Sequence, residues 1–301
     1  MLARRKTHTR RLRRWLPLLA FVLAWVFSSV AAAETILFVG NSFFYGEGSP
    51  AKRYGTQTVT DLNDTGFGGV PALFKAFADE AGLEYVVSLE TVPGANLDLH
   101  YTEKRAVLDA SWDCVVMSGH STLDREQPGD PAKLVRYAGL LAEMFHRRNP
   151  DVQVYLNATW PRADQTYLKT GHWYGKPIAA MANDVRAGYD LAATQSALIK
   201  AVIPTGRSWI RAMETGVADS NPYDGLTFGK IDLWTYDQYH ASAYGYYLEA
   251  LMIFGRVTGR SPQALGQRET AAEALGLSRD HVQALQRVAH DELVASGVRF
   301  P

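Results

Sequence analysis

Three side chains in this sequence could together perform nucleophilic catalysis. Ser42 follows Gly40-Asn41 directly after an apolar run, and Asp237 and His240 lie three residues apart near the C-terminal end. A serine hydroxyl becomes an effective nucleophile when a base accepts its proton, and the base needs an acid that fixes its tautomer. We predict that Ser42 is the nucleophile, His240 the base and Asp237 the acid. Taken alone, Gly-Asn-Ser is also a common turn, and Asp-x-x-His before a helix can serve as a cap.

Attack on a carbonyl carbon creates a negatively charged oxygen, which requires hydrogen-bond donors already aimed at it. The backbone N–H groups of Ser42 and Gly94 are the natural candidates, because both residues follow strand-like segments. A lone glycine such as Gly94 often serves only backbone geometry. The order of these segments along the chain is therefore more informative than each of them alone.

Alternating strand and helix patterns place these residues at one edge of a sheet. Gly and Pro punctuate short apolar runs that are separated by amphipathic stretches, which predicts strands joined by helices and hence a parallel sheet covered on both faces. Ligands of such sheets bind beyond the carboxyl ends of the strands. The predicted strands are 36–39, 85–89, 114–117, 152–156 and 201–204, and the predicted helices are 71–82, 131–148, 178–195, 241–257 and 279–295.

These blocks resemble those of the SGNH/GDSL hydrolases. Gly40-Asn41-Ser42 is similar to their first block with Asn41 in place of the usual Asp, Gly94 matches their second-block glycine, and Asp237-x-x-His240 matches their last block. The segments 36–43, 113–122, 159–162 and 240–248 resemble a bacterial branch of largely uncharacterised exported proteins. The resemblance implies an α/β, three-layer α/β/α flavodoxin-like fold with a five-stranded parallel sheet. It also implies hydrolysis of esters, often acetyl groups on sugars, with no cofactor and no metal.

The third block departs from that family. SGNH hydrolases have a Gly-x-Asn-Asp turn whose Asn side chain donates to the oxyanion, whereas this chain has Ser118-Gly119-His120-Ser121-Thr122. The predicted oxyanion donors are therefore Ser42, Gly94 and either His120 or Ser121. Asn41, Trp160 and Arg162 are predicted substrate contacts, although a Trp near a pocket is as often part of the core.

The first 33 residues predict export. A basic opening with seven Lys or Arg residues precedes an apolar run from Trp15 to Phe27 and the small residues Val30-Ala31-Ala32-Ala33. This order is typical of a secretory signal peptide, and the apolar run is shorter than a membrane span requires. We expect a signal peptide over 1–33, a single domain over 34–301, a periplasmic or secreted location, and no stable membrane span after cleavage. The alternative is an uncleaved N-terminal anchor.

Charge and composition exclude several other classes of function. Without the leader the chain keeps 24 basic and all 31 acidic residues, a net charge of −7, so it lacks the basic excess that binding to nucleic acid requires. The single Cys114 can form no internal disulfide. The remaining histidines show no spacing typical of metal ligands.

The sequence therefore predicts an exported serine esterase that acts on a small-molecule or glycan ester, such as an acyl group on a carbohydrate or a cell-envelope glycan. Two alternatives stay open. The first is a carbohydrate-binding protein that keeps the fold without catalysis, which the altered third block favours. The second is a lipase or thioesterase with an apolar channel for an acyl chain.

Overall fold

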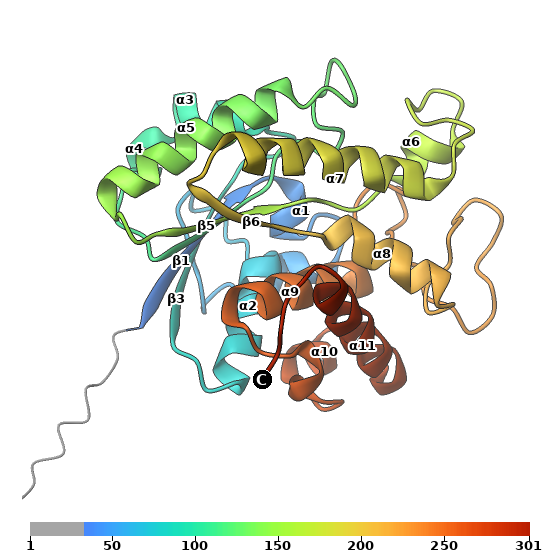
Figure 1. Ribbon diagram of the computed structural model, residues 1–301. Coiled ribbons are helices and arrows are strands. Elements are labelled where there is room, and N and C mark those ends of the chain that lie inside the picture. The colour runs from blue at the N-terminus through green and yellow to red at the C-terminus, as the bar shows by residue number, and fades with distance from the viewer. Residues whose placement is uncertain (1–32) are drawn as a thin grey trace, which may run out of the picture. The chain divides into compact units, whose positions relative to one another are not determined.

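A six-stranded parallel sheet lies at the centre of the part of the chain that the computed structural model describes, residues 33–301, which form one compact unit (Figure 1). The predicted signal peptide falls outside the described residues. The strand order is β2-β3-β1-β4-β5-β6, and every strand pair is parallel. The strands are β1 (Glu34–Gly40), β2 (Thr60–Asp61), β3 (Tyr85–Thr91), β4 (Cys114–Met117), β5 (Gln153–Asn157) and β6 (Ile199–Ile203).

The sequence-based prediction of five strands is wrong by one, because β2 was missed. This strand has two residues, Thr60 and Asp61, which pair with Ser88 and Leu89 at the edge of the sheet. Two residues are too few to display the alternation of apolar and polar side chains that marks a strand. The other five strands have the flavodoxin-like order expected from the resemblance.

Helices cover both faces of the sheet, as the three-layer prediction requires. In β1, Ile36 and Phe38 point into one buried cluster and Leu37 and Val39 into the other. Because successive side chains of a strand alternate between faces, a strand covered on both sides reads as one continuous apolar run. Figure 1 shows α5 and α7 on one face and α2 and α9 on the other.

The helices have the following bounds: α1 (Ser42–Tyr45), α2 (Gly69–Glu80), α3 (Leu97–Glu103), α4 (Arg105–Leu108), α5 (Ala132–Arg148), α6 (Ala163–Tyr167), α7 (Ile178–Gln195), α8 (Thr205–Glu214), α9 (Ala243–Thr258), α10 (Thr270–Ala274) and α11 (Arg279–Ala295), with two short 3₁₀ segments at Pro50–Arg53 and Pro262–Leu265.

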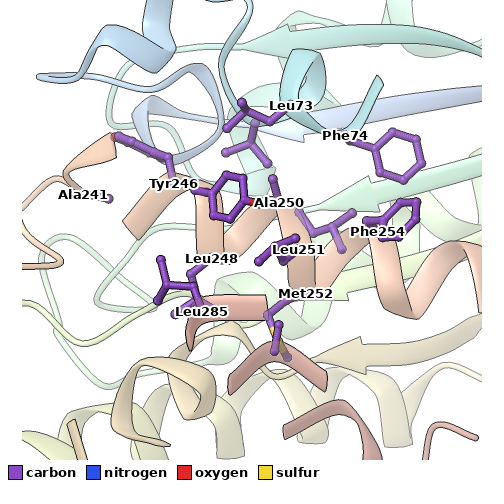
Figure 2. Close-up of a cluster of buried hydrophobic side chains, with 14 of the residues drawn as sticks. Leu73, Phe74, Ala241, Tyr246, Leu248, Ala250, Leu251, Met252, Phe254 and Leu285 are labelled. Carbon is purple, nitrogen blue, oxygen red and sulfur yellow. The ribbon is translucent and has the colours of Figure 1, made fainter. Parts of the chain in front are cut away.

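On the face of the sheet that α2 and α9 cover, α9 is the central helix, and it is buried along most of its length. It packs between α2 and α11, and Figure 2 shows its side chains facing Leu73 and Phe74 of α2 and Leu285 of α11. At its N-terminal end, the Tyr246 hydroxyl lies 3.2 Å from the carbonyl oxygen of Ser42 and 3.0 Å from that of Glu47. The core helix is thereby connected to the turn that follows β1.

One side chain holds together the carboxyl ends of three neighbouring strands. The Asn41 amide, directly after β1, donates to the carbonyl oxygens of Ala95 (2.9 Å) and Gly119 (3.0 Å), which follow β3 and β4. Its oxygen accepts from Phe43 N at 3.1 Å, which caps α1. All three hydrogen bonds are buried. Both N–H donors of the Asn41 amide and its oxygen acceptor therefore have protein partners.

We predict that Asn41→Asp destabilises the fold by roughly 2–4 kcal/mol, because a carboxylate has no N–H to offer and faces two carbonyl oxygens in a buried site. Urea unfolding followed by circular dichroism measures the change. Asn183→Asp is the matched control, since Asn183 is exposed and its oxygen accepts from Arg207. Equal stability of Asn41→Asp and the wild type would contradict the role given to this amide.

Candidate active site

Ser42 opens the short helix α1 at the end of β1. The Asn41 side chain caps this helix, and the Ser42 side chain and backbone together are only 5% exposed. Ser42 N stands at the first helical position, where a backbone N–H has no partner within the helix, and it donates to no acceptor in the described residues. The turn therefore presents a hydroxyl and a free N–H at the same place.

The loop that carries Asp237 and His240 is closed by a bridge between Trp234 and Ala241, immediately before α9. Asp237 Oδ1 accepts from Tyr239 N (3.0 Å) and His240 N (2.9 Å), which fixes the backbone of the loop. The tightness of the turn appears in a φ of 56° at Gln238, a left-handed conformation that side chains other than Gly rarely adopt.

The three predicted catalytic residues form a continuous chain of hydrogen bonds. Asp237 Oδ2 lies 2.6 Å from His240 Nδ1, and His240 Nε2 lies 3.0 Å from Ser42 Oγ. A carboxylate only accepts, so Nδ1 is the protonated nitrogen and Nε2 is left to accept from the serine hydroxyl. This is the tautomer in which an imidazole can act as the base for a serine.

The electrostatics of Asp237 suit its place in this chain. Burial acts to raise the pKa of the carboxyl, but the hydrogen bonds from the His240 ring and from the N–H groups of His240 and Tyr239 outweigh it and lower the pKa. Asp237 is thus a carboxylate at neutral pH, able to stabilise a positive charge on the imidazole that it holds.

Gly94 forms a tight turn after β3. Its φ of 66° favours glycine, and its N–H donates to no acceptor in the described residues. The next residue, Ala95, is the one whose carbonyl oxygen accepts from Asn41 beside Ser42. The fold therefore provides two backbone N–H groups near the nucleophile, those of Ser42 and Gly94.

The altered third block forms a buried turn after β4. His120 Nδ1 lies 2.8 Å from Thr122 Oγ1, and His120 N donates to Asn96 Oδ1 at 3.1 Å. Burial, followed by the charges of Arg162 and Arg125, lowers the pKa of His120 to about 4, so its ring is neutral at neutral pH. Ser121, only 2% exposed, accepts a hydrogen bond from Arg162 Nη1 at 3.2 Å.

The three predicted substrate contacts, Asn41, Trp160 and Arg162, contact other residues of the protein through their side chains. Trp160 is fully buried and stacks on Phe43, with 3.9 Å between ring centroids. The Asn41 amide is committed to three backbone partners. Arg162 is paired with Asp164 through two hydrogen bonds of 2.9 and 2.6 Å. Their roles as substrate contacts stay predictions. The partners that hold these side chains in the structure are residues that a single sequence does not show to be near.

Two residues near the candidate site, Tyr239 beside His240 and Arg125 beside Gly94, were missed by sequence reasoning. The Tyr239 ring stacks on the His240 ring with 4.1 Å between centroids, and its only sequence signal is its position between Asp237 and His240. Arg125 Nη1 lies 3.9 Å from the position that a Cβ on Gly94 would occupy. Nothing in the local pattern around Arg125 marks it as part of a site.

Four cavities lie away from the triad in the described residues, and Ser42, Asp237 and His240 line none of these four. A cavity of about 520 Å³ lies beside the third-block turn, lined by residues that include Leu123, His172, Asp184 and Gly188. Three smaller cavities, of about 260, 250 and 220 Å³, also have no triad residue in their lining.

Within residues 33–301, no cluster of three or more His, Cys, Asp or Glu side chains is arranged to hold a metal ion. No helix in that range is long and apolar enough to cross a membrane.

No protein-family model and no curated protein sequence matches this chain. Solved structures do match its fold. A DUF4886 family protein from Bacteroides uniformis superposes with a TM-score of 0.57 and 16% identity, over 89% of this chain and 97% of that one. A candidate GDSL-like lipase from Parabacteroides merdae superposes with a TM-score of 0.51 and 16% identity, over 75% of this chain and 95% of that one. The predicted fold is confirmed: the chain has the three-layer α/β/α fold of the SGNH/GDSL hydrolases.

Proposed function

We propose that this protein is an exported serine esterase, with Ser42, His240 and Asp237 as its catalytic triad. The observation that carries the proposal is the hydrogen-bond chain from Asp237 Oδ2 through the His240 ring to Ser42 Oγ, with lengths of 2.6 and 3.0 Å. A binding protein has no need to hold an imidazole in the tautomer that accepts a serine proton, so this chain favours catalysis over the binding alternative.

The chemistry proceeds in two stages. Ser42 Oγ attacks the ester carbonyl carbon while its proton passes to His240 Nε2, and the carbonyl electron pair moves onto oxygen. The free N–H groups of Ser42 and Gly94 donate to that oxyanion. His240 then protonates the leaving alcohol, which leaves an acyl group on Ser42. A water molecule activated by the same histidine releases the acid and restores the serine.

Ser42→Ala is expected to abolish ester hydrolysis while the protein keeps its fold, because the hydroxyl contributes only one hydrogen bond. Asp237→Asn should lower kcat by about 10⁴-fold, since the amide no longer holds the tautomer. Turnover of p-nitrophenyl acetate and labelling by a fluorophosphonate measure both effects. The control is Asp190→Asn on α7, whose carboxylate pairs with Arg186 at the surface. An active Ser42→Ala variant would exclude the triad.

A small acyl group is the substrate that this geometry favours. The nucleophile is only 5% exposed, and a short acyl group needs the least room to bring its carbonyl carbon to Ser42. On this basis the lipase or thioesterase alternative is the weaker one.

Exposed aromatic side chains beside the triad support a glycan as the alcohol half of the ester. Tyr236, which is 84% exposed, directly precedes Asp237. Tyr223, which is 43% exposed, lies with its ring centroid 6.2 Å from that of Tyr167 on α6, the helix whose Asp164 N donates to the Gln238 oxygen of the same loop. The C–H faces of sugar rings carry partial positive charge and pack well on the negative faces of such rings.

We expect kcat/KM to fall by about tenfold or more from acetyl to octanoyl p-nitrophenyl esters, because the longer chain needs more room. On an acetylated oligosaccharide, Tyr236→Ala should raise KM severalfold and leave turnover of p-nitrophenyl acetate unchanged. Tyr174→Ala is the matched control, because Tyr174 is also exposed, at 50%. Faster hydrolysis of the long-chain ester would support the lipase alternative. Glycan binding without turnover of any ester would support the binding protein.

The export proposal rests on the basic, apolar and small-residue order of the first 33 residues. Expression in a bacterial host with an intact secretion pathway should yield mature protein beginning near Glu34, as read by N-terminal sequencing of the exported fraction. Exported material that retains Met1 would contradict cleavage and favour the uncleaved anchor.

A further inference from the structure

The segment from Trp160 to Asp164, which follows β5 and enters the first turn of α6, is called the platform here because it supports the loop that carries Asp237 and His240. Three hydrogen bonds join the two segments: Trp160 Nε1 to the Tyr239 oxygen (3.2 Å), Trp234 Nε1 to the Pro161 oxygen (3.0 Å), and Asp164 N to the Gln238 oxygen (3.3 Å). The triad itself uses no residue of the platform. The three hydrogen bonds of the platform nevertheless hold the turn that carries Asp237 and His240 at Trp234, before the turn, and at Gln238 and Tyr239, within it.

Arg162 adds a fourth contact, to the Tyr239 ring that stacks on the catalytic His240 ring. Its guanidinium carbon lies 3.6 Å from the centroid of the Tyr239 ring, whose other neighbour in the stack is the His240 ring at 4.1 Å. The two hydrogen bonds to Asp164 fix the plane of the guanidinium, and the side chain is 12% exposed. A planar cation held in this way limits the space in which Tyr239 and hence His240 can move.

The same guanidinium sets the direction of the Ser121 hydroxyl. Arg162 Nη1 donates to Ser121 Oγ, and a guanidinium cannot accept a hydrogen bond. The hydroxyl hydrogen of Ser121 must therefore point away from Arg162, and it meets no acceptor in residues 33–301. Ser121 lies two residues after Gly119, whose carbonyl oxygen accepts from Asn41 beside the nucleophile.

We propose that Ser121 Oγ–H is the third oxyanion donor and that Arg162 is the positioning residue that orients it while clamping the His240 loop. This inference rests on the proposed esterase function. Ser121 thereby takes the part of the Asn side chain that the third block lacks. Lysine can replace Arg162 only in part, because an ammonium keeps the charge but offers neither the flat face for Tyr239 nor the fixed fork for Asp164 and Ser121 together.

The test compares Ser121→Ala, Arg162→Met, Arg162→Lys and the double variant Ser121→Ala/Arg162→Met on p-nitrophenyl acetate. Ser121→Ala should lower kcat by about 100-fold with little change in KM. Arg162→Met should lower kcat at least as much, with only a partial recovery in Arg162→Lys. In the double variant the loss should be close to that of Arg162→Met alone, because both changes remove the same donor.

Arg186→Met on α7 is the matched control, since it also breaks an Arg–Asp pair but lies on an exposed helix surface. Thermal unfolding of every variant separates a lost fold from a lost donor. Wild-type kcat in Ser121→Ala, or an effect of Arg162→Met confined to KM, overturns this inference while Ser42→Ala is inactive. Activity retained in Ser42→Ala marks the failure of the proposed function itself.

Discussion

The Asn41 amide is the contact on which the geometry of the site depends, because it holds the carboxyl ends of β1, β3 and β4 in one arrangement. Its two donors and one acceptor match two carbonyl oxygens and one N–H. Aspartate, usual at this position in the SGNH family, could satisfy only the N–H. The replacement in the first block is thus explained by what surrounds it, including the Gly119 carbonyl of the third block, where the chain also departs from the family.

A column of aromatic rings joins the two halves of the triad. Phe43, next to the nucleophile, stacks on Trp160 at 3.9 Å, Trp160 stacks on Trp209 at 5.0 Å, and Trp209 meets Trp234 at 5.3 Å. Trp234 begins the loop of Asp237 and His240, so the rings connect a turn after β1 with a loop almost 200 residues later. Buried rings of this size resist displacement, which is how a 3.0 Å contact between Ser42 and His240 can be kept without a covalent link.

Local patterns were enough to predict five of the six strands and the five longest helices of residues 33–301. They also selected Ser42, Asp237 and His240, which the structure joins by hydrogen bonds. The predicted helices at 178–195 and 279–295 have the same bounds in the structure. The parts that could not be predicted depend on distant partners. The acceptors of the Asn41 amide lie 54 and 78 residues away, and β2 is too short to leave a pattern. Burial of Trp160 likewise follows from packing that no local spacing encodes.

The charges around the site are arranged asymmetrically, in the sense that the proposed reaction requires. Positive charge develops on His240, and the Asp237 carboxylate lies directly against that ring. Negative charge develops on the substrate oxygen at the opposite end, where Arg125 approaches Gly94. The charge of Arg162 is balanced by Asp164, and His120 stays neutral because its pKa is lowered to about 4. Fixed charges and dipoles of this kind stabilise the separated charges of the transition state without having to reorganise. The neutral Arg162–Asp164 pair is therefore better suited to orienting its neighbours than to attracting an anion, in agreement with a positioning role.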